Sequence, residues 1–272
     1  MSLMRINYIH KEIKKLKPVI QNLITNYNND FQKYDSEYIK FEKEELIQES
    51  KNNNMSYDIQ QEKNKYLDSL DDLKSLAQFQ NELMLVKHMA LLENCIINTF
   101  KCLIDLSQHQ EYKKTYFIEI ENFSDSFIAS NKIKELTDGK IDLKKIKFWD
   151  LYETMKTIRN SIAHGEPLFI ISYNRVKRFN KEINIIFPYS EKNEDKPRNG
   201  FPSLIHPTYE KNSKWFCHLS DDISNLSELN KKCLEFIEEI KNLYLSYGKH
   251  KKISKHELYG CTSYNKNEET NS

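Results

Sequence analysis

The stretch KKIKFWDLYETMKTIRNSIAHG, residues 144–165, combines an amphipathic helix with its own end signal. Its apolar residues alternate between spacings of three and four, which draws one stripe along a helix: Phe148, Leu151, Met155, Ile158 and Ile162. Gly165 offers a left-handed C-terminal cap, and Pro167 cannot continue the helix. We therefore predict a helix from about Lys144 to His164 whose C-terminal end is exposed.

The composition places this helix in an all-α protein. The chain has 272 residues and 39% hydrophobic content, which is enough for a sizeable core. Only 5 Gly and 6 Pro interrupt it, and low Gly and Pro content favours helix. We predict an up-down helical bundle over residues 81–248, formed by helices at about 81–106, 111–131, 144–164 and 223–247.

Three further regions surround the predicted bundle. Residues 1–80 carry long helices that would form an arm or an extra layer, and their stripe could pack on another helix or form a dimer. Residues 166–220 form an insert before the last helix, with a small β-hairpin made of strands at 182–187 and 215–219 and a long surface loop at 189–214. Residues 249–272 are polar, and we expect a loosely held, flexible tail.

The most apolar helix, 83–106, carries one carboxylate on its predicted core stripe. The stripe consists of Leu83, Val86, Ala90, Ile97, Phe100 and Ile104, and Glu93 falls among them. A buried carboxylate needs a partner, so Arg159 or His164 could pair with Glu93 as support for the site. A partly exposed Glu93 paired with a lysine is the alternative.

Several classes of function find no support in the sequence. The net charge is +1, so no global field draws the chain to nucleic acid or membrane. Five cysteines lack metal-ligand spacing, and no glycine-rich phosphate loop occurs. No signal peptide or membrane-spanning apolar run is found. We expect a cytoplasmic protein that needs no metal or other cofactor and does not bind membranes.

The predicted helix end holds the residues with the clearest chemistry. Arg159 presents a fixed fork of donors that suits two oxygens of one phosphate. His164 lies at the negative end of the helix dipole and can move a proton near neutral pH. Five residues turn a regular helix by roughly 140°, so Arg159 and His164 do not share a face. They would converge across a groove or with help from a second helix or subunit.

The sequence Arg159-Asn160-x-x-x-His164 resembles the motif of the HEPN superfamily (higher eukaryotes and prokaryotes nucleotide-binding). Many members are metal-independent ribonucleases of toxin–antitoxin, phage-defence or RNA-processing systems. The resemblance implies that Arg159 and His164 are catalytic and that Asn160 positions them or the substrate. It also implies a homodimer through the motif helix, an RNA substrate, and room for an antitoxin or an activating partner. In the alternative interpretation, Arg159 pairs with a carboxylate and His164 is only a cation at a helix end.

A strip after the motif mixes cations with an aromatic residue, which suits RNA phosphates and a stacked base. It consists of Arg175, Lys177, Arg178 and Phe179. A solvated turn would have the same composition, so both interpretations stay open.

Three functional hypotheses follow from the sequence. The first is a metal-independent endoribonuclease that cleaves through the 2′-OH to 2′,3′-cyclic phosphate products. The second is a non-catalytic HEPN-like module that binds RNA, a nucleotide or a protein. The third is a structural interaction protein built on the long N-terminal helices.

Overall fold

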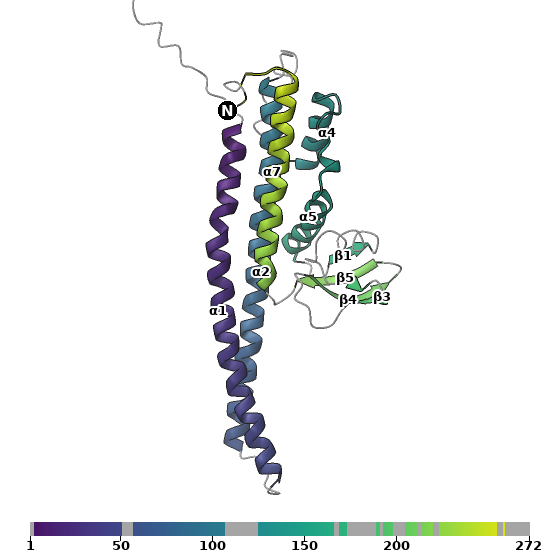
Figure 1. The fold of residues 1–272 in the computed structure, drawn as a ribbon. Helices are drawn as coiled ribbons and strands as arrows, with labels where there is room; N and C mark the ends of the chain where they lie inside the picture. Colours follow the sequence, from purple (N-terminus) through teal and green to yellow (C-terminus); the bar gives the residue numbers. More distant parts are fainter. Residues whose placement is uncertain are drawn as a thin grey trace, which may run out of the picture. The chain divides into compact units, whose positions relative to one another are not determined.

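The structure is a computed structural model, and it describes residues 3–50, 57–106, 125–165, 169–172, 189–190, 193–197, 205–211, 214–219, 223–254 and 258. Most of these residues are helical, which confirms the predicted all-α class (Figure 1). The helices are α1 (Leu3–Ser50), α2 (Tyr57–Leu106), α4 (Ser126–Leu136), α5 (Trp149–Ala163) and α7 (Leu226–His250), with short 3-10 turns η1 (Leu143–Lys145) and η2 (Ile223–Asn225). Within these ranges no helix is both long enough and apolar enough to cross a bilayer.

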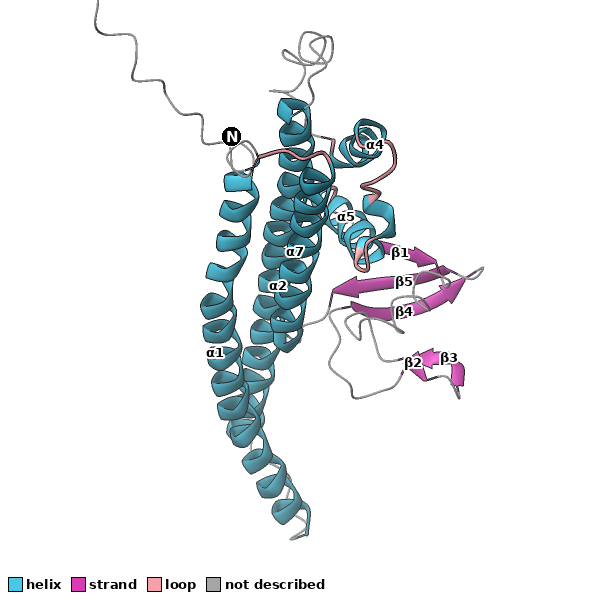
Figure 2. Ribbon diagram, turned by 45° about the horizontal axis from the view of Figure 1, so that its top comes forward, coloured by secondary structure: helices cyan, strands magenta, loops and turns pink. Residues whose placement is uncertain are grey.

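The strands are short and antiparallel (Figure 2). β5 (Lys214–Leu219) lies between β1 (Phe169–Ser172) and β4 (Ile205–Lys211), and β2 (Tyr189–Ser190) pairs with β3 (Asn193–Pro197). The predicted long loop at 189–214 is therefore wrong where β2, β3 and β4 occur. β4 contains Pro207, which is tolerated because β4 is an edge strand and its register shifts between Pro207 and Tyr209.

The predicted strand at 182–187 lies outside the described part of the chain, so its pairing with 215–219 stays a prediction. Among the described residues, β5 pairs with β1 and β4.

The chain divides into two compact units. One contains residues 1–15, 87–153 and 230–272, and the other contains residues 16–86 and 154–229. α2 is continuous through residue 80, so the predicted arm and the predicted bundle share one helix.

In the first unit, α7 lies beside the C-terminal part of α2 (Figure 1). Several apolar residues of α7 that lie in this unit are buried, including Phe236, Ile237 and Ile240 at 1% exposure or less. Two buried polar side chains join these helices, because His88 Nε2 lies 2.9 Å from Asn230 Oδ1. This bond gives two otherwise costly buried polar groups a partner.

The core stripe predicted for α2 is wrong in its first part. Leu83 is 53% exposed and Ala90 is exposed, whereas Phe100 and Ile104 are buried. Spacings of three and four repeat every 3.5 residues, but a straight helix turns every 3.6, so such a line drifts by about 20° per heptad. Over the three heptads from Leu83 to Ile104 it moves from the exposed face to the buried face.

In the second unit, α1 and α2 pack antiparallel. The rings of Phe41 and Tyr66 lie 5.1 Å apart between centroids. Lys63 forms an ion pair with Glu45 and also lies over the ring of Tyr38, 5.5 Å from its centroid. Tyr38 and Phe41 of α1 therefore pack against another helix of the same chain.

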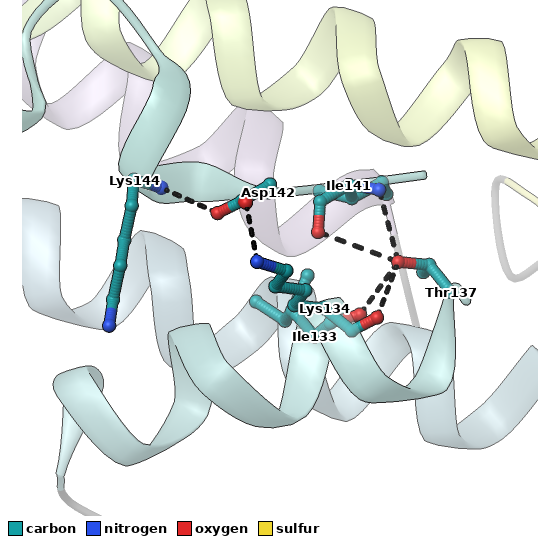
Figure 3. A network of polar contacts seen from close by, with 6 residues as sticks. All are labelled: Ile133, Lys134, Thr137, Ile141, Asp142 and Lys144. Carbon is teal, nitrogen blue, oxygen red and sulfur yellow. Dashed lines mark hydrogen bonds and ion pairs between the residues drawn. The ribbon is translucent and has the colours of Figure 1, made fainter. Parts of the chain in front are cut away.

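The chain enters α5 through a polar network between α4 and η1 (Figure 3). The hydroxyl of buried Thr137 donates to the carbonyl of Ile133 at 2.8 Å and accepts from the N–H of Ile141 at 3.0 Å. Asp142 pairs with Lys134 at 2.8 Å and accepts from the N–H of Lys144 at 3.3 Å. These contacts fix a turn where the sequence predicted the start of the motif helix.

The motif helix accordingly starts later than predicted. Ile146, which follows η1, has an extended backbone with φ of −70° and ψ of 149°, and α5 begins at Trp149. The side chain of Ile146 is buried. Burying this apolar residue in an extended conformation separates η1 from α5, so residues 144–148 do not continue the helix.

The last helix also extends beyond its predicted end. α7 continues through Gly248 to His250, and Leu258 is 3% exposed. A Cβ on Gly248 would meet Leu258 Cδ2 at 2.4 Å, so the glycine permits close packing instead of ending the helix. Leu258 therefore lies against α7, whereas most of the predicted flexible tail at 249–272 lies outside the described residues and stays a prediction.

Candidate functional site

α5 ends where the sequence predicts, on a glycine in the left-handed conformation. Gly165 has a φ of +68°, and its N–H donates to the carbonyl of Ile162 at 3.0 Å. The N–H of His164 donates to the carbonyl of Asn160, also at 3.0 Å. These bonds satisfy carbonyls that the end of a helix otherwise leaves without partners. The predicted glycine cap is confirmed.

The buried face of α5 orients its last turns. Met155 and Ile158, two residues of the predicted stripe, are each 1% exposed, whereas its last residue, Ile162, is half-buried. Asn160 and His164 are exposed. Residues four apart lie on one side of a helix, so Asn160 and His164 share the solvent-facing side. This side can meet a large polymer without any opening of the core.

Arg159 occupies a different side of the same turns. The residue is half-buried, and its Nε atom is buried. It precedes His164 by five positions, which corresponds to a rotation of roughly 140° on a regular helix. One copy of α5 thus places the guanidinium and the imidazole at one helix end but directs them to different sides.

Glu93 forms a hydrogen bond with Ser126, a residue other than those expected from the sequence. Glu93 is half-buried, and its Oε1 accepts from the hydroxyl of Ser126 at 3.4 Å. The Ser126 hydroxyl also bonds to the hydroxyl of Tyr152. Glu93 belongs to the first unit, whereas Arg159 and His164 belong to the second. Pairing of Glu93 with either motif residue stays a prediction.

Tyr152 is a residue that the sequence analysis missed. It is 0% exposed, its ring stacks on Phe236 at 5.7 Å, and Trp149 lies 4.8 Å away between centroids. A buried tyrosine hydroxyl needs a hydrogen-bond partner. A tyrosine beside the apolar stripe of α5 was therefore a signal for a nearby polar group, which is Ser126.

The predicted RNA-contact strip cannot be placed. Arg175, Lys177, Arg178 and Phe179 lie outside the described residues. Their role stays a prediction from the sequence.

Comparisons with models of protein families, with curated proteins and with solved structures found no match. The likeness to the HEPN superfamily therefore rests on Arg159, Asn160 and His164 and on the helix that carries them.

Proposed function

We propose that this chain is a metal-independent endoribonuclease of the HEPN type, acting in a toxin, phage-defence or RNA-processing role. The observation that carries the proposal is the end of α5. His164 is exposed beside a left-handed glycine cap, one turn after exposed Asn160, with Arg159 in the same turns. An exposed imidazole and a guanidinium at the same helix end provide a proton carrier and a phosphate ligand, which a second copy could bring to one phosphate.

The proposed architecture is an up-down bundle that includes α2, α5 and α7, with a β-hairpin insert before α7. Two copies would pair through α5, so that two motifs face one groove. The support for pairing is geometric, since Arg159 and His164 diverge by roughly 140° on one helix. A second copy would supply the complementary residue from the opposite side of the groove.

In the proposed reaction, His164 removes the proton from a ribose 2′-OH, and the 2′ oxygen attacks the adjacent phosphorus. The bond from phosphorus to the 5′ oxygen breaks, and that oxygen receives a proton, which the protonated histidine can supply. Arg159 stabilises the negative charge that grows on the phosphate. Asn160 orients the substrate or the two catalytic side chains. The products are a 2′,3′-cyclic phosphate and a 5′-hydroxyl, and DNA resists because it lacks the nucleophile.

A non-catalytic HEPN-like module that binds RNA, a nucleotide or a protein is the second candidate. It is favoured by the same divergence of Arg159 and His164, because phosphate binding does not require the two side chains to converge on one bond.

Alanine substitutions at Arg159 and His164 separate the two candidates when cleavage and RNA affinity are measured on the same preparations. In an enzyme, His164→Ala lowers the cleavage rate by about 10² to 10⁴-fold with little change in affinity. In a binding module, affinity falls instead, and in a scaffold neither changes. His250→Ala is the matched control, because His250 is also exposed at the end of a helix, α7. If His250→Ala lowers the cleavage rate as much as His164→Ala, the proposed site is wrong.

A further inference from the structure

Three large apolar side chains near the middle of α2 lie on its surface within two turns of one another. Leu76, Phe79 and Leu83 are 51%, 54% and 53% exposed. Their spacings of three and four place them on one side of the helix, and we call them the α2 stripe. The other side of the same turns is buried, since Ala77 is 1% and Asn81 is 0% exposed. This part of α2 therefore has a second apolar side, whereas a helix on a monomer's surface needs only one.

We propose that the α2 stripe is the surface at which a second copy of this chain binds, with the two α2 helices antiparallel. The inference goes beyond the proposed nuclease activity and does not rest on it. It follows from the order of residues on either side of Phe79.

The α2 stripe is complementary to itself in the antiparallel direction. If the two-fold axis passes between Phe79 and Gln80, Leu76 of one copy lies opposite Leu83 of the other. The two Phe79 side chains then meet beside the axis. Each apolar residue is matched by another apolar residue, as a two-fold symmetric interface requires.

The charges at the ends of the stripe favour the same arrangement. Asp72 lies four residues before Leu76, and Lys87 lies four residues after Leu83, and both are exposed. In the antiparallel pair, Asp72 of each copy lies opposite Lys87 of the other, at both ends of the contact. In a parallel pair with the residues in register, Asp72 would face Asp72. Opposite charges select the antiparallel pair, because like charges in apposition oppose association.

The first test is the association state of the full chain, measured by sedimentation over a concentration series. Phe79→Ser should raise the dissociation constant of the α2 contact about 100-fold or more, because a symmetric interface loses the side chain twice. Leu46→Ser is the matched control, since Leu46 is a 64% exposed apolar residue on α1. Both variants should keep the helical circular dichroism of the wild type. Because pairing through α5 would by itself give a dimer, the readout is the additional association that Phe79→Ser removes and Leu46→Ser keeps. A wild type whose association state at about 100 μM equals that of Phe79→Ser would overturn the inference.

The second test asks whether the two α2 helices are antiparallel, by cross-linking single introduced cysteines with a short bismaleimide. The background chain has Cys217 and Cys261 replaced by serine. Mixed Leu76→Cys and Leu83→Cys chains should cross-link more strongly than either variant alone. Strong cross-linking of each variant with itself, and none in the mixture, would overturn the antiparallel arrangement.

Charge reversal independently tests whether Asp72 of one copy lies opposite Lys87 of the other. Asp72→Lys should weaken association, and adding Lys87→Asp to the same chain should restore it. A double variant weaker than Asp72→Lys alone would contradict the proposed pairing. Because none of these experiments measures RNA cleavage, their outcome is separate from that of the nuclease proposal.

Discussion

Replacing Gly165 with alanine tests how far the helix cap positions the motif. Gly165 has a φ of +68°, and a Cβ built there has nothing within 4 Å, so the substitution meets no steric obstacle. The cost is confined to the backbone. A left-handed conformation costs an L-residue roughly 1–2 kcal/mol. Alanine also restricts the unfolded chain, which stabilises the folded state by roughly 0.4–1 kcal/mol. The net loss of folding stability is therefore about 1 kcal/mol.

Gly139→Ala provides a matched control for this change. Gly139 has a φ of +74° after α4, and its Cβ would also have nothing within 4 Å. Both variants should therefore lower the thermal midpoint by a similar amount, about 2–4 °C for a chain of this size, measured by circular dichroism. Only Gly165→Ala should also slow RNA cleavage, because only Gly165 directly follows His164.

Two results would refute this reasoning. Equal cleavage by the two glycine variants would show that the cap does not position His164. A stability loss for Gly139→Ala without one for Gly165→Ala would show that the left-handed cap of α5 is not under backbone constraint. The thermal stability of Gly165→Asn should lie between that of Gly165→Ala and that of the wild type, because asparagine tolerates the left-handed region better than alanine does.

Three further predictions concern stability. Thr137→Val leaves a buried N–H without its acceptor and should cost about 1–3 kcal/mol in urea unfolding, whereas Thr137→Ser should cost less. The hydrogen bond and ion pair with Lys134 hold the pKa of Asp142 below its ordinary value of 3.8. The folded state therefore gains stability above that value and loses it as the pH falls below about 4, so the gap in thermal midpoint between wild type and Asp142→Asn should narrow with acid. Leu258→Ala removes a buried side chain that packs on Gly248 and should cost about 2 kcal/mol or more.

Each of these predictions has a contrary result. Equal stability of Thr137→Val and Thr137→Ser would show that the hydroxyl of Thr137 does not stabilise the turn. A gap between wild type and Asp142→Asn that widens in acid would mean that the sign assigned to Asp142 is wrong. An unchanged unfolding midpoint for Leu258→Ala would support the loose tail that the sequence predicted.

The sequence predicted the features of this chain that depend on neighbouring residues. The buried stripes of α5 and α7 and the cap at Gly165 depend on periodicity and on one glycine, which are visible in the sequence. The start of α5 was missed because it depends on tertiary contacts. Ile146 is extended and buried, and Thr137 bonds to Ile141 across a turn, and neither fact follows from helix propensity.

The remaining errors have two physical causes. The stripe of α2 was extrapolated from Leu83 to Ile104, but helical drift over three heptads changed its face, and Leu83 proved exposed. The strand β4 was missed because Pro207 disfavours a central strand, although an edge position tolerates it. Sequence patterns did not identify which strand is an edge.

The proposed nuclease cleaves RNA with His164 and without a metal ion. The most direct test is digestion of mixed tRNA and single-stranded RNA by wild type and His164→Ala in EDTA, with analysis of the product ends. We expect cleavage by the wild type that leaves 2′,3′-cyclic phosphates and 5′-hydroxyls and is lost in His164→Ala. Cleavage that requires added metal, or that persists unchanged in His164→Ala, would contradict it, and a folded wild type that binds RNA without cutting would favour the binding module.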